Sequence, residues 1–215
     1  MLFTREHMLL YAVTDRSWLG DRRLTDQVEE ILKAGATLLQ LREKELSFDE
    51  FVTEAKQMKK ITERYQIPLI INDSIDVAVA AGADGVHLGQ GDDNILKARE
   101  ILGRKKIIGI SAHTVEEAMD AQNNGADYLG VGAVFGTATK KDAGIVTYEI
   151  LKEICEAVTI PVVAIGGINS DNIMKLAGSG VAGVAVISAL FAGKEPARET
   201  KKLQELAKNM VSINS

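Results

Sequence analysis

Short apolar runs alternate with longer amphipathic stretches along the whole chain. A run of about four to six apolar residues next to glycine or polar residues is typical of a buried strand. Apolar positions spaced three and four residues apart are typical of a helix that packs against a sheet. Eight apolar runs occur, and a helical pattern follows each of them. The expected strands cover residues 9–13, 38–41, 69–71, 85–88, 107–110, 128–131, 162–165 and 183–187.

A recurring phrase marks four of the joints between a helical pattern and the next apolar run. It reads AGAT, AGAD, NGAD and SGVA in turn, with glycine at positions 35, 82, 125 and 180. Glycine just after a helix is typical of a left-handed C-cap. The four glycines are 47, 43 and 55 residues apart, which is about two strand-plus-helix units each time. The spacing therefore predicts four pairs of units.

Uninterrupted alternation of strand and helix indicates a parallel sheet. Eight units in 215 residues are enough to close a (β/α)8 (TIM) barrel, and an open doubly wound sheet is the competing arrangement. No Pro-, Ser- or Gly-rich linker divides the chain, so we expect a single domain over residues 1–215 with its active site at the C-terminal ends of the strands. Two helices are expected to begin with capping boxes, Ser47 with Glu50 and Thr114 with Glu117.

Charge and cysteine content narrow the class of partner. With 25 basic and 30 acidic residues the net charge is −5, which argues against nucleic acid or an anionic membrane as the main partner. No stretch approaches the roughly 18 to 20 apolar residues that cross a bilayer, and the apolar run near the N-terminus is too short for a signal peptide. The single Cys155 excludes an intrachain disulfide. We expect a cytoplasmic protein that binds small molecules.

Two cations follow the second strand. Period-two alternation places Gln40, Arg42 and Lys44 on the same side, near the mouth of the barrel. Neighbouring cations repel unless an anion lies between them, and a diphosphate would satisfy both. The alternative is a solvated charge cluster in which Glu43 and Glu45 pair with these cations.

Carboxylates follow the third and fourth strands. Asn72 and Asp73 end the third, and Asp92 and Asp93 follow the fourth. One carboxylate from each loop, together with ligand oxygens and waters, is the kind of shell that Mg²⁺ prefers. Helix capping by Asp73 and Asp92 is an equally good interpretation of their positions.

The fifth strand leads to Ser111 and His113. No carboxylate is evidently placed to orient His113, so we reject a catalytic triad. We interpret Ser111 as a hydroxyl that contacts phosphate or relays a proton, His113 as a residue at a helix entry, and His87 as a hydrogen-bonded interior residue.

The last three strand ends indicate phosphate binding. Backbone donors at Gly166, Gly167 and the turn that begins at Ile187 and Ser188 resemble the phosphate cup of barrel enzymes, although the glycines could serve only helix packing. The segment 130–144 lies beside this cup and does not match the P-loop pattern. Its hydroxyls and ammonium groups can hold an anion, and they come from Thr137, Thr139, Lys140 and Lys141.

These motifs together resemble the thiamine-phosphate synthase family over nearly the whole chain. The motifs are LYAVTD, QLREK, IND, ADGVHLGQGD, GISAHT, GADYLGVGAVFGTATKKDA, PVVAIGGI and VAVIS, in this order. The resemblance implies a (β/α)8 barrel that joins 4-amino-2-methyl-5-hydroxymethylpyrimidine diphosphate to 4-methyl-5-(2-hydroxyethyl)thiazole phosphate, or its carboxylated form. It implies Mg²⁺ as cofactor, pyrophosphate release and a dissociative transfer without a protein nucleophile.

The resemblance also implies roles for individual residues. The pyrimidine diphosphate would contact Gln40, Arg42, Lys44, Asn72, Ser111 and Lys140, and catalysis would rest on Arg42, Lys44, Ser111 and Lys140. The thiazole phosphate would contact Thr137, Thr139, Gly167, Ile187 and Ser188, and Mg²⁺ would bind Asp73 and Asp92. Many members have a second aspartate where this chain has Ser74.

Two other functions stay open. A thiazole tautomerase would use a related barrel without the diphosphate and metal residues, and a non-catalytic phosphate sensor would need only the cup. A phosphosugar isomerase would need a general base, and none stands out. The sequence also leaves open whether the chain forms a homo-oligomer.

Overall fold

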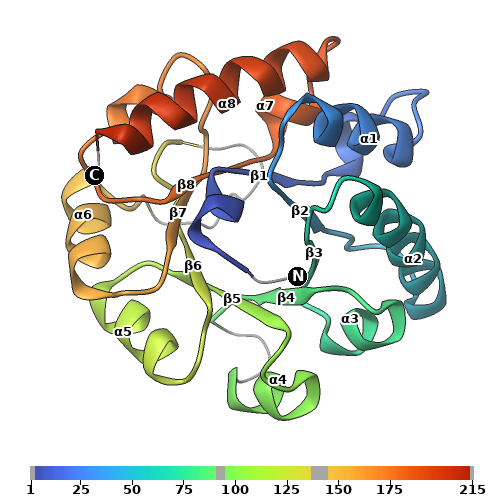
Figure 1. Ribbon diagram of the computed structural model, residues 1–215, viewed down its shortest axis with the longest axis horizontal. Coiled ribbons are helices and arrows are strands. Elements are labelled where there is room, and N and C mark those ends of the chain that lie inside the picture. The colour runs from blue at the N-terminus through green and yellow to red at the C-terminus, as the bar shows by residue number, and fades with distance from the viewer. Residues whose placement is uncertain (1–2, 91–94, 137–144, 214–215) are drawn as a thin grey trace.

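Eight parallel strands form a closed barrel in the computed structural model, which describes residues 3–90, 95–136 and 145–213 (Figure 1). Each strand pairs with the next in sequence, and β1 pairs with β8 to close the ring. This confirms the (β/α)8 barrel and excludes the open sheet. The strands are β1 (Leu10–Val13), β2 (Leu38–Leu41), β3 (Leu69–Asn72), β4 (Gly85–Leu88), β5 (Ile107–Ala112), β6 (Tyr128–Val131), β7 (Val162–Ile165) and β8 (Gly183–Val186).

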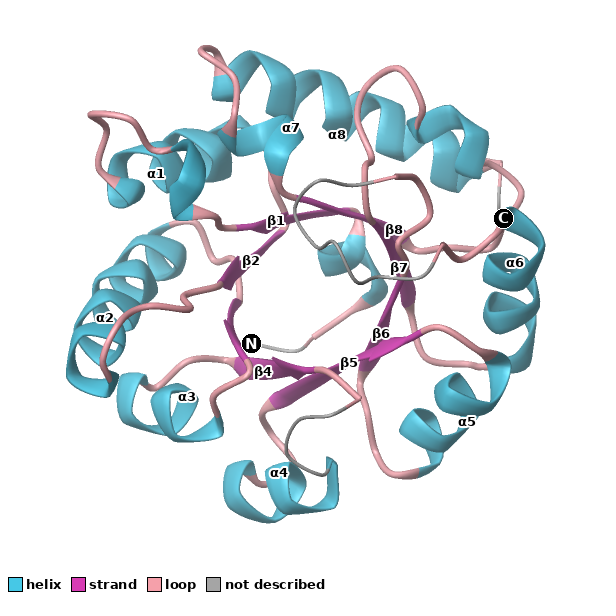
Figure 2. Cartoon of the chain, turned by 180° about the vertical axis from the view of Figure 1, so that it is seen from behind, coloured by secondary structure: helices cyan, strands magenta, loops and turns pink. Residues whose placement is uncertain are grey.

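The helices form the outer layer around this ring (Figure 2). Their amphipathic patterns bury one face against the strands. They are α1 (Leu24–Ala34), α2 (Phe48–Arg64), α3 (Ile75–Ala81), α4 (Ile95–Leu102), α5 (Val115–Asn123), α6 (Tyr148–Ala157), α7 (Ser188–Phe191) and α8 (Pro196–Ser212). Short 3-10 helices are η1 (Arg5–Met8), η2 (Arg16–Trp18) and η3 (Ile173–Leu176). Among the described residues, no helix combines the length and apolar character needed to cross a bilayer.

The helix expected after the seventh strand is only the 3-10 turn η3. Left-handed glycines follow it closely, Gly178 at φ +83° and Gly180 at φ +89°, and they end the helical segment before it can lengthen.

One of the two predicted capping boxes is only half formed. The Ser47 N–H donates to Glu50 at 3.0 Å as expected, whereas the Glu117 carboxylate accepts the N–H of His113 at 2.7 Å instead of that of Thr114.

The core has two parts, one between strands and helices and one inside the barrel. The inner part contains two fully buried tyrosines, Tyr11 and Tyr128, among aliphatic side chains. At the N-terminal end of the barrel, η1 lies across the opening, and buried Met8 packs into the inner part (Figure 1). The inner core therefore leaves only the opposite end of the barrel available to a ligand.

The recurring glycine joints have the backbone conformation that the sequence predicts. Gly35, Gly82, Gly125 and Gly180 all have positive φ, between +67° and +119°. These values confirm the left-handed turns that end helical segments before β2, β4, β6 and β8.

The residue two positions after the glycine ties neighbouring strands together. The Asp84 carboxylate accepts the backbone N–H of Leu69 at 2.8 Å, and the Asp127 carboxylate accepts that of Ile108 at 2.7 Å. Lys59 pairs with Asp84, and Arg99 pairs with Asp127. These bonds lie at the N-terminal ends of the strands, where polar groups of a barrel commonly serve stability.

Candidate active site

A cavity of about 1010 Å³, counting its open mouth, lies at the carboxyl ends of the strands. All eight strands or the residues directly after them contribute to its wall. Residues expected in the site that line the cavity are Gln40, Arg42, Asn72, Ser111, Gly167, Ile187 and Ser188.

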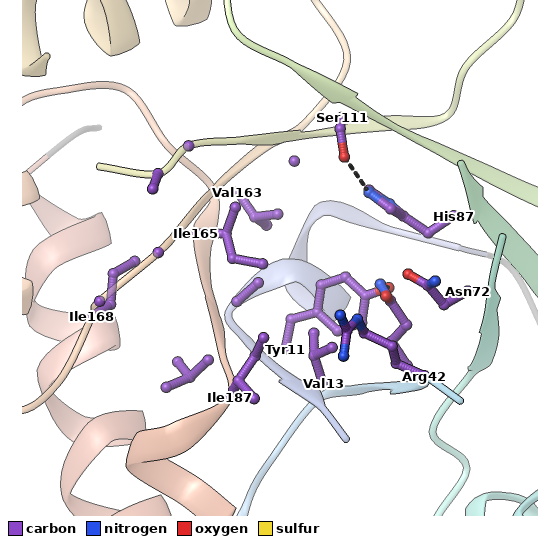
Figure 3. Close-up of a pocket in the computed structure, with 18 of the residues that line it drawn as sticks. Tyr11, Val13, Arg42, Asn72, His87, Ser111, Val163, Ile165, Ile168 and Ile187 are labelled. Atoms are coloured by element: carbon purple, nitrogen blue, oxygen red, sulfur yellow. Dashed lines mark hydrogen bonds between the residues drawn. The ribbon is translucent and has the colours of Figure 1, made fainter. Parts of the chain in front are cut away.

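The cavity has a polar side and an apolar side (Figure 3). Arg42, Asn72, His87 and Ser111 lie on the side formed by β2 to β5. The other side, formed by the ends of β7 and β8, carries aliphatic side chains that include Ile165, Ile168 and Ile187. A ligand in this cavity can therefore place a charged group against one wall and an apolar ring against the other.

Arg42 is held at the cavity by contacts with the end of β1. Its backbone N–H donates to the Thr14 hydroxyl at 2.9 Å, and its guanidinium lies 3.9 Å from the Asp15 carboxylate. The side chain keeps 19% of its surface exposed. Lys44 lies in the following turn, where it is exposed and does not line the cavity among the described residues. Its predicted contact with a diphosphate remains a prediction.

Glu43 does not neutralise the cation before it in the sequence. Its carboxylate accepts from Arg16 Nε at 2.7 Å, and Arg16 also pairs with Glu54. The Glu43 side chain is 3% exposed, and its Oε1 has no hydrogen-bond partner in the described part of the chain. Burial raises the pKa of Glu43 from about 4.5 to about 7, although the hydrogen bond from Arg16 opposes this shift. The alternative interpretation, a solvated cluster in which Glu43 pairs with Arg42, is therefore wrong, because Glu43 pairs with Arg16.

Glu43 is expected to make stability depend on pH. Between its ordinary pKa of about 4.5 and its folded pKa of about 7, the folded state binds more protons than the unfolded state. The free energy of unfolding should therefore fall as pH rises through this window. Glu43→Gln should lose that part of the slope in urea unfolding measured from pH 5 to pH 8. The exposed neighbour provides the control, Glu45→Gln, and equal slopes in both variants would contradict the assignment.

Asp73 directly follows β3 and is not the residue that caps α3. Ser74 is the N-cap, and its hydroxyl accepts the N–H of Val77 at 3.3 Å. Asp73 has φ +60°, an uncommon conformation for a residue other than glycine, and its N–H donates to the carbonyl of His87 at 2.9 Å. Its side chain is exposed at the mouth end of the strand. For Asp73, the capping interpretation is therefore wrong, because Ser74 caps α3.

The structure brings His87, rather than His113, to Ser111. His87 Nε2 lies 3.1 Å from the Ser111 hydroxyl (Figure 3), and its Nδ1 lies 2.9 Å from the Tyr128 hydroxyl. His113 Nδ1 contacts the Glu117 carboxylate at the start of α5, at 3.1 Å, which agrees with a helix-entry role. The expectation that no carboxylate orients His113 is therefore wrong. The interior hydrogen bonds expected for His87 are present. Its place in the cavity wall was not predicted, because the sequence does not show which neighbouring strand it faces.

The loop after β6 lies against the end of β7. Val134 N–H donates to Ile165 at 3.0 Å and Phe135 N–H donates to Gly166 at 3.1 Å. A Cβ at Gly167 would lie 2.4 Å from the carbonyl oxygen of Gly136, so glycine is required for this approach. Ser188 begins the short helix α7, as the sequence predicts, and first-turn N–H groups have no partner within a helix. The expected neighbourhood of the two glycines, the serine and this loop is therefore present.

Several expected site residues lie outside the described residues. These are Asp92, Thr137, Thr139 and Lys140. Within residues 3–90, 95–136 and 145–213, no three metal-ligating side chains come together. Cys155 is away from the cavity lining, and burial raises the pKa of its thiol to about 12.

Comparison with known proteins gives one consistent result. The family described as "Thiamine monophosphate synthase" matches residues 10–190. A thiamine-phosphate synthase of Clostridium acetobutylicum is 52% identical over 93% of this chain and 94% of its own length. One of Ruminiclostridium cellulolyticum is 48% identical over 93% of this chain and 95% of its own. The solved thiamine phosphate pyrophosphorylase of Pyrococcus furiosus is 39% identical, with a TM-score of 0.89 over 96% of this chain and 98% of that one.

Proposed function

Since the chain belongs to the thiamine monophosphate synthase family, we propose that it joins a hydroxymethylpyrimidine diphosphate to a thiazole phosphate and releases pyrophosphate. Family membership makes the chain a transferase of thiamine biosynthesis. The finer proposal rests on one observation above all, the two-sided cavity. Arg42 and Ser111 line it from the side of β2 to β5, and Gly167 and Ser188 line it from the ends of β7 and β8.

The polar wall suits the pyrimidine diphosphate. Arg42 can grip phosphate oxygens through two parallel N–H groups, and the Ser111 hydroxyl offers a further contact. Gln40 and Asn72 offer amides to the ring and the diphosphate. Lys44 and Lys140 would add positive charge from the adjoining loops, as the family resemblance implies.

Magnesium suits an exposed carboxylate at the mouth end of β3. Asp73 is exposed there and takes no part in capping α3, and an oxygen donor is the ligand type that Mg²⁺ prefers. Asp73 would hold the ion together with Asp92. Bound Mg²⁺ would neutralise charge on the diphosphate.

The opposite wall suits the thiazole phosphate. Gly167 lines the cavity beside the loop after β6, and Ser188 presents the first turn of α7. Ile187 would contact the ring. Thr137 and Thr139 would complete the phosphate contacts.

In the proposed dissociative transfer, the bond between the pyrimidine methylene carbon and the diphosphate oxygen breaks first, and the thiazole nitrogen then bonds to that carbon. The aminopyrimidine ring stabilises the cation between these events. The chain supplies positioning of two substrates and neutralisation of the leaving charge, which Arg42, Lys44 and Lys140 would share. No side chain is required as a nucleophile, and Ser111 acts as a donor to the departing group.

The experiment is to incubate the purified protein with both substrates, with and without Mg²⁺, and to measure thiamine phosphate and pyrophosphate. We expect both products in equal amounts only when metal is present. Asp73→Ala should raise the Mg²⁺ concentration needed for half-maximal rate, whereas the surface control Asp76→Ala should not. Absence of product with metal present would refute the synthase proposal. The cytoplasmic location remains a prediction from the sequence.

A further inference from the structure

A continuous hydrogen-bond chain crosses the interior of the barrel below the cavity. Gln40 Nε2 donates to the Tyr11 hydroxyl at 2.7 Å, and this hydroxyl lies 2.8 Å from that of Tyr128. Tyr128 then contacts His87 Nδ1 at 2.9 Å, and His87 Nε2 contacts the Ser111 hydroxyl at 3.1 Å. The chain therefore links Gln40 on β2 to Ser111 on β5, the two ends that line the polar wall.

The middle of this hydrogen-bond chain is buried and closely packed. Tyr11 is 1% exposed and Tyr128 is fully buried, and their rings meet edge to face at 5.9 Å. A Cβ at Gly109 would lie 2.3 Å from the Tyr128 hydroxyl, so the strand at this point leaves space for that group. Burial raises the pKa of both tyrosines far above the ordinary value near 10. Both hydroxyls therefore keep their hydrogens and can donate.

Counting hydrogens gives the hydrogen-bond chain a direction of donation, from Gln40 to Ser111. The Tyr11 oxygen accepts from Gln40, and among the described residues its hydroxyl contacts only one further group, Tyr128. A buried hydroxyl hydrogen needs an acceptor, so Tyr11 must donate to Tyr128.

The remaining bonds follow from that direction. Tyr128 then donates to His87 Nδ1, which makes the histidine carry its hydrogen on Nε2. His87 Nε2 therefore donates to the Ser111 oxygen. The opposite direction would require the Gln40 amide to be turned over so that its carbonyl oxygen accepts the Tyr11 hydrogen, whereas the structure places Nε2 there.

We propose that Tyr11, Tyr128 and His87 are positioning residues that make Gln40 present its carbonyl oxygen, and Ser111 its hydroxyl hydrogen, to the ligand. The wall then selects a molecule with a hydrogen-bond donor that faces Gln40 and an anionic acceptor that faces Ser111. Given the proposed function, on which this assignment rests, the donor is the amino group of the pyrimidine and the acceptor is a diphosphate oxygen. The same direction prevents His87 from acting as a base toward Ser111, because its Nε2 already carries a hydrogen.

The direction can be tested without any substrate. In ¹⁵N NMR of protein labelled in its histidine rings, with His87→Gln used for assignment, His87 should show an unprotonated Nδ1 and a protonated Nε2 at pH 8. Tyr128→Phe removes the donor to Nδ1 and should shift the ring toward the other tautomer. A protonated Nδ1 in the unmodified protein would overturn the proposal, even if the synthase activity is present.

Kinetics test the positioning role. Tyr11→Phe and Tyr128→Phe should each lower kcat/KM for the pyrimidine diphosphate about tenfold, with KM for the thiazole phosphate unchanged. The double variant should have about the same kcat/KM as each single variant, because one break already removes the fixed direction of the hydrogen-bond chain. Tyr65→Phe is the control, since its hydroxyl bonds to Glu29 on the outer helices.

Two outcomes would contradict the positioning role. One is a loss of kcat/KM in the double variant that equals the product of the two single losses. The other is an equal rise in KM for both substrates. If the unmodified protein has no synthase activity, the proposed function fails, and the histidine tautomer then decides the direction of the chain by itself.

Discussion

Arg42→Ala is expected to lower kcat for thiamine phosphate formation by about 100- to 1000-fold, which is the usual effect of removing one preorganised donor to developing charge. Arg42 is the cation that the fold fixes in the cavity wall, through Thr14 and Asp15. Its loss should slow departure of pyrophosphate more than it weakens binding of the thiazole phosphate. Steady-state kinetics with each substrate varied in turn would measure the difference.

Two further variants sharpen this test. Arg42→Lys keeps the charge but loses the planar fork, so it should recover only part of the rate. Arg64→Ala removes an exposed arginine that pairs with Glu29 on the outer helices, and it should leave kcat unchanged. A full rate in Arg42→Ala would remove Arg42 from the proposed mechanism.

Gly183→Ala is expected to lower the free energy of unfolding by about 3 kcal/mol, at the upper end of the usual cost of overpacking. Gly183 begins β8, and a Cβ there would lie 2.0 Å from the carbonyl oxygen of Met8 and 2.6 Å from Leu9 Cα. Both contacts are with backbone, which cannot move without disturbing the pairing of β8 with β1. Urea unfolding at neutral pH would measure the loss.

Gly193→Ala provides the matched control. A Cβ at Gly193 would meet nothing within 4 Å, so this variant should be as stable as the unmodified protein. Equal free energies of unfolding for the two alanine variants would contradict this prediction, because they would show that the pairing of β1 with β8 accommodates the extra methyl group.

The architecture could be predicted because it depends on local patterns. Apolar runs with glycine joints place every strand within a few residues of its observed bounds, and the left-handed turns at Gly82 and Gly125 follow from the same pattern. Several site residues could also be predicted, because the carboxyl ends of parallel strands always meet at one end of a barrel. Arg42, Asn72 and Ser111 were found in this way.

The contacts between side chains inside the barrel could not be predicted. Tyr11 and Tyr128 lie in apolar runs and are 117 positions apart, and only the closed ring brings their hydroxyls together. Position alone also left open whether Asp73 caps a helix, because Ser74 follows it and either residue can do so. The backbone turn at Asp73 decides in favour of Ser74.

The bonds of Asp84 and Asp127 lie at the end of the barrel opposite the cavity, and this separation affects how the protein can change. Because these bonds between strands are remote from the ligand, a library randomised at Ile165 and Ile187, which are only partly buried, should yield mostly folded proteins. Mutations in this wall can therefore change which acceptor ring the protein binds without changing the barrel.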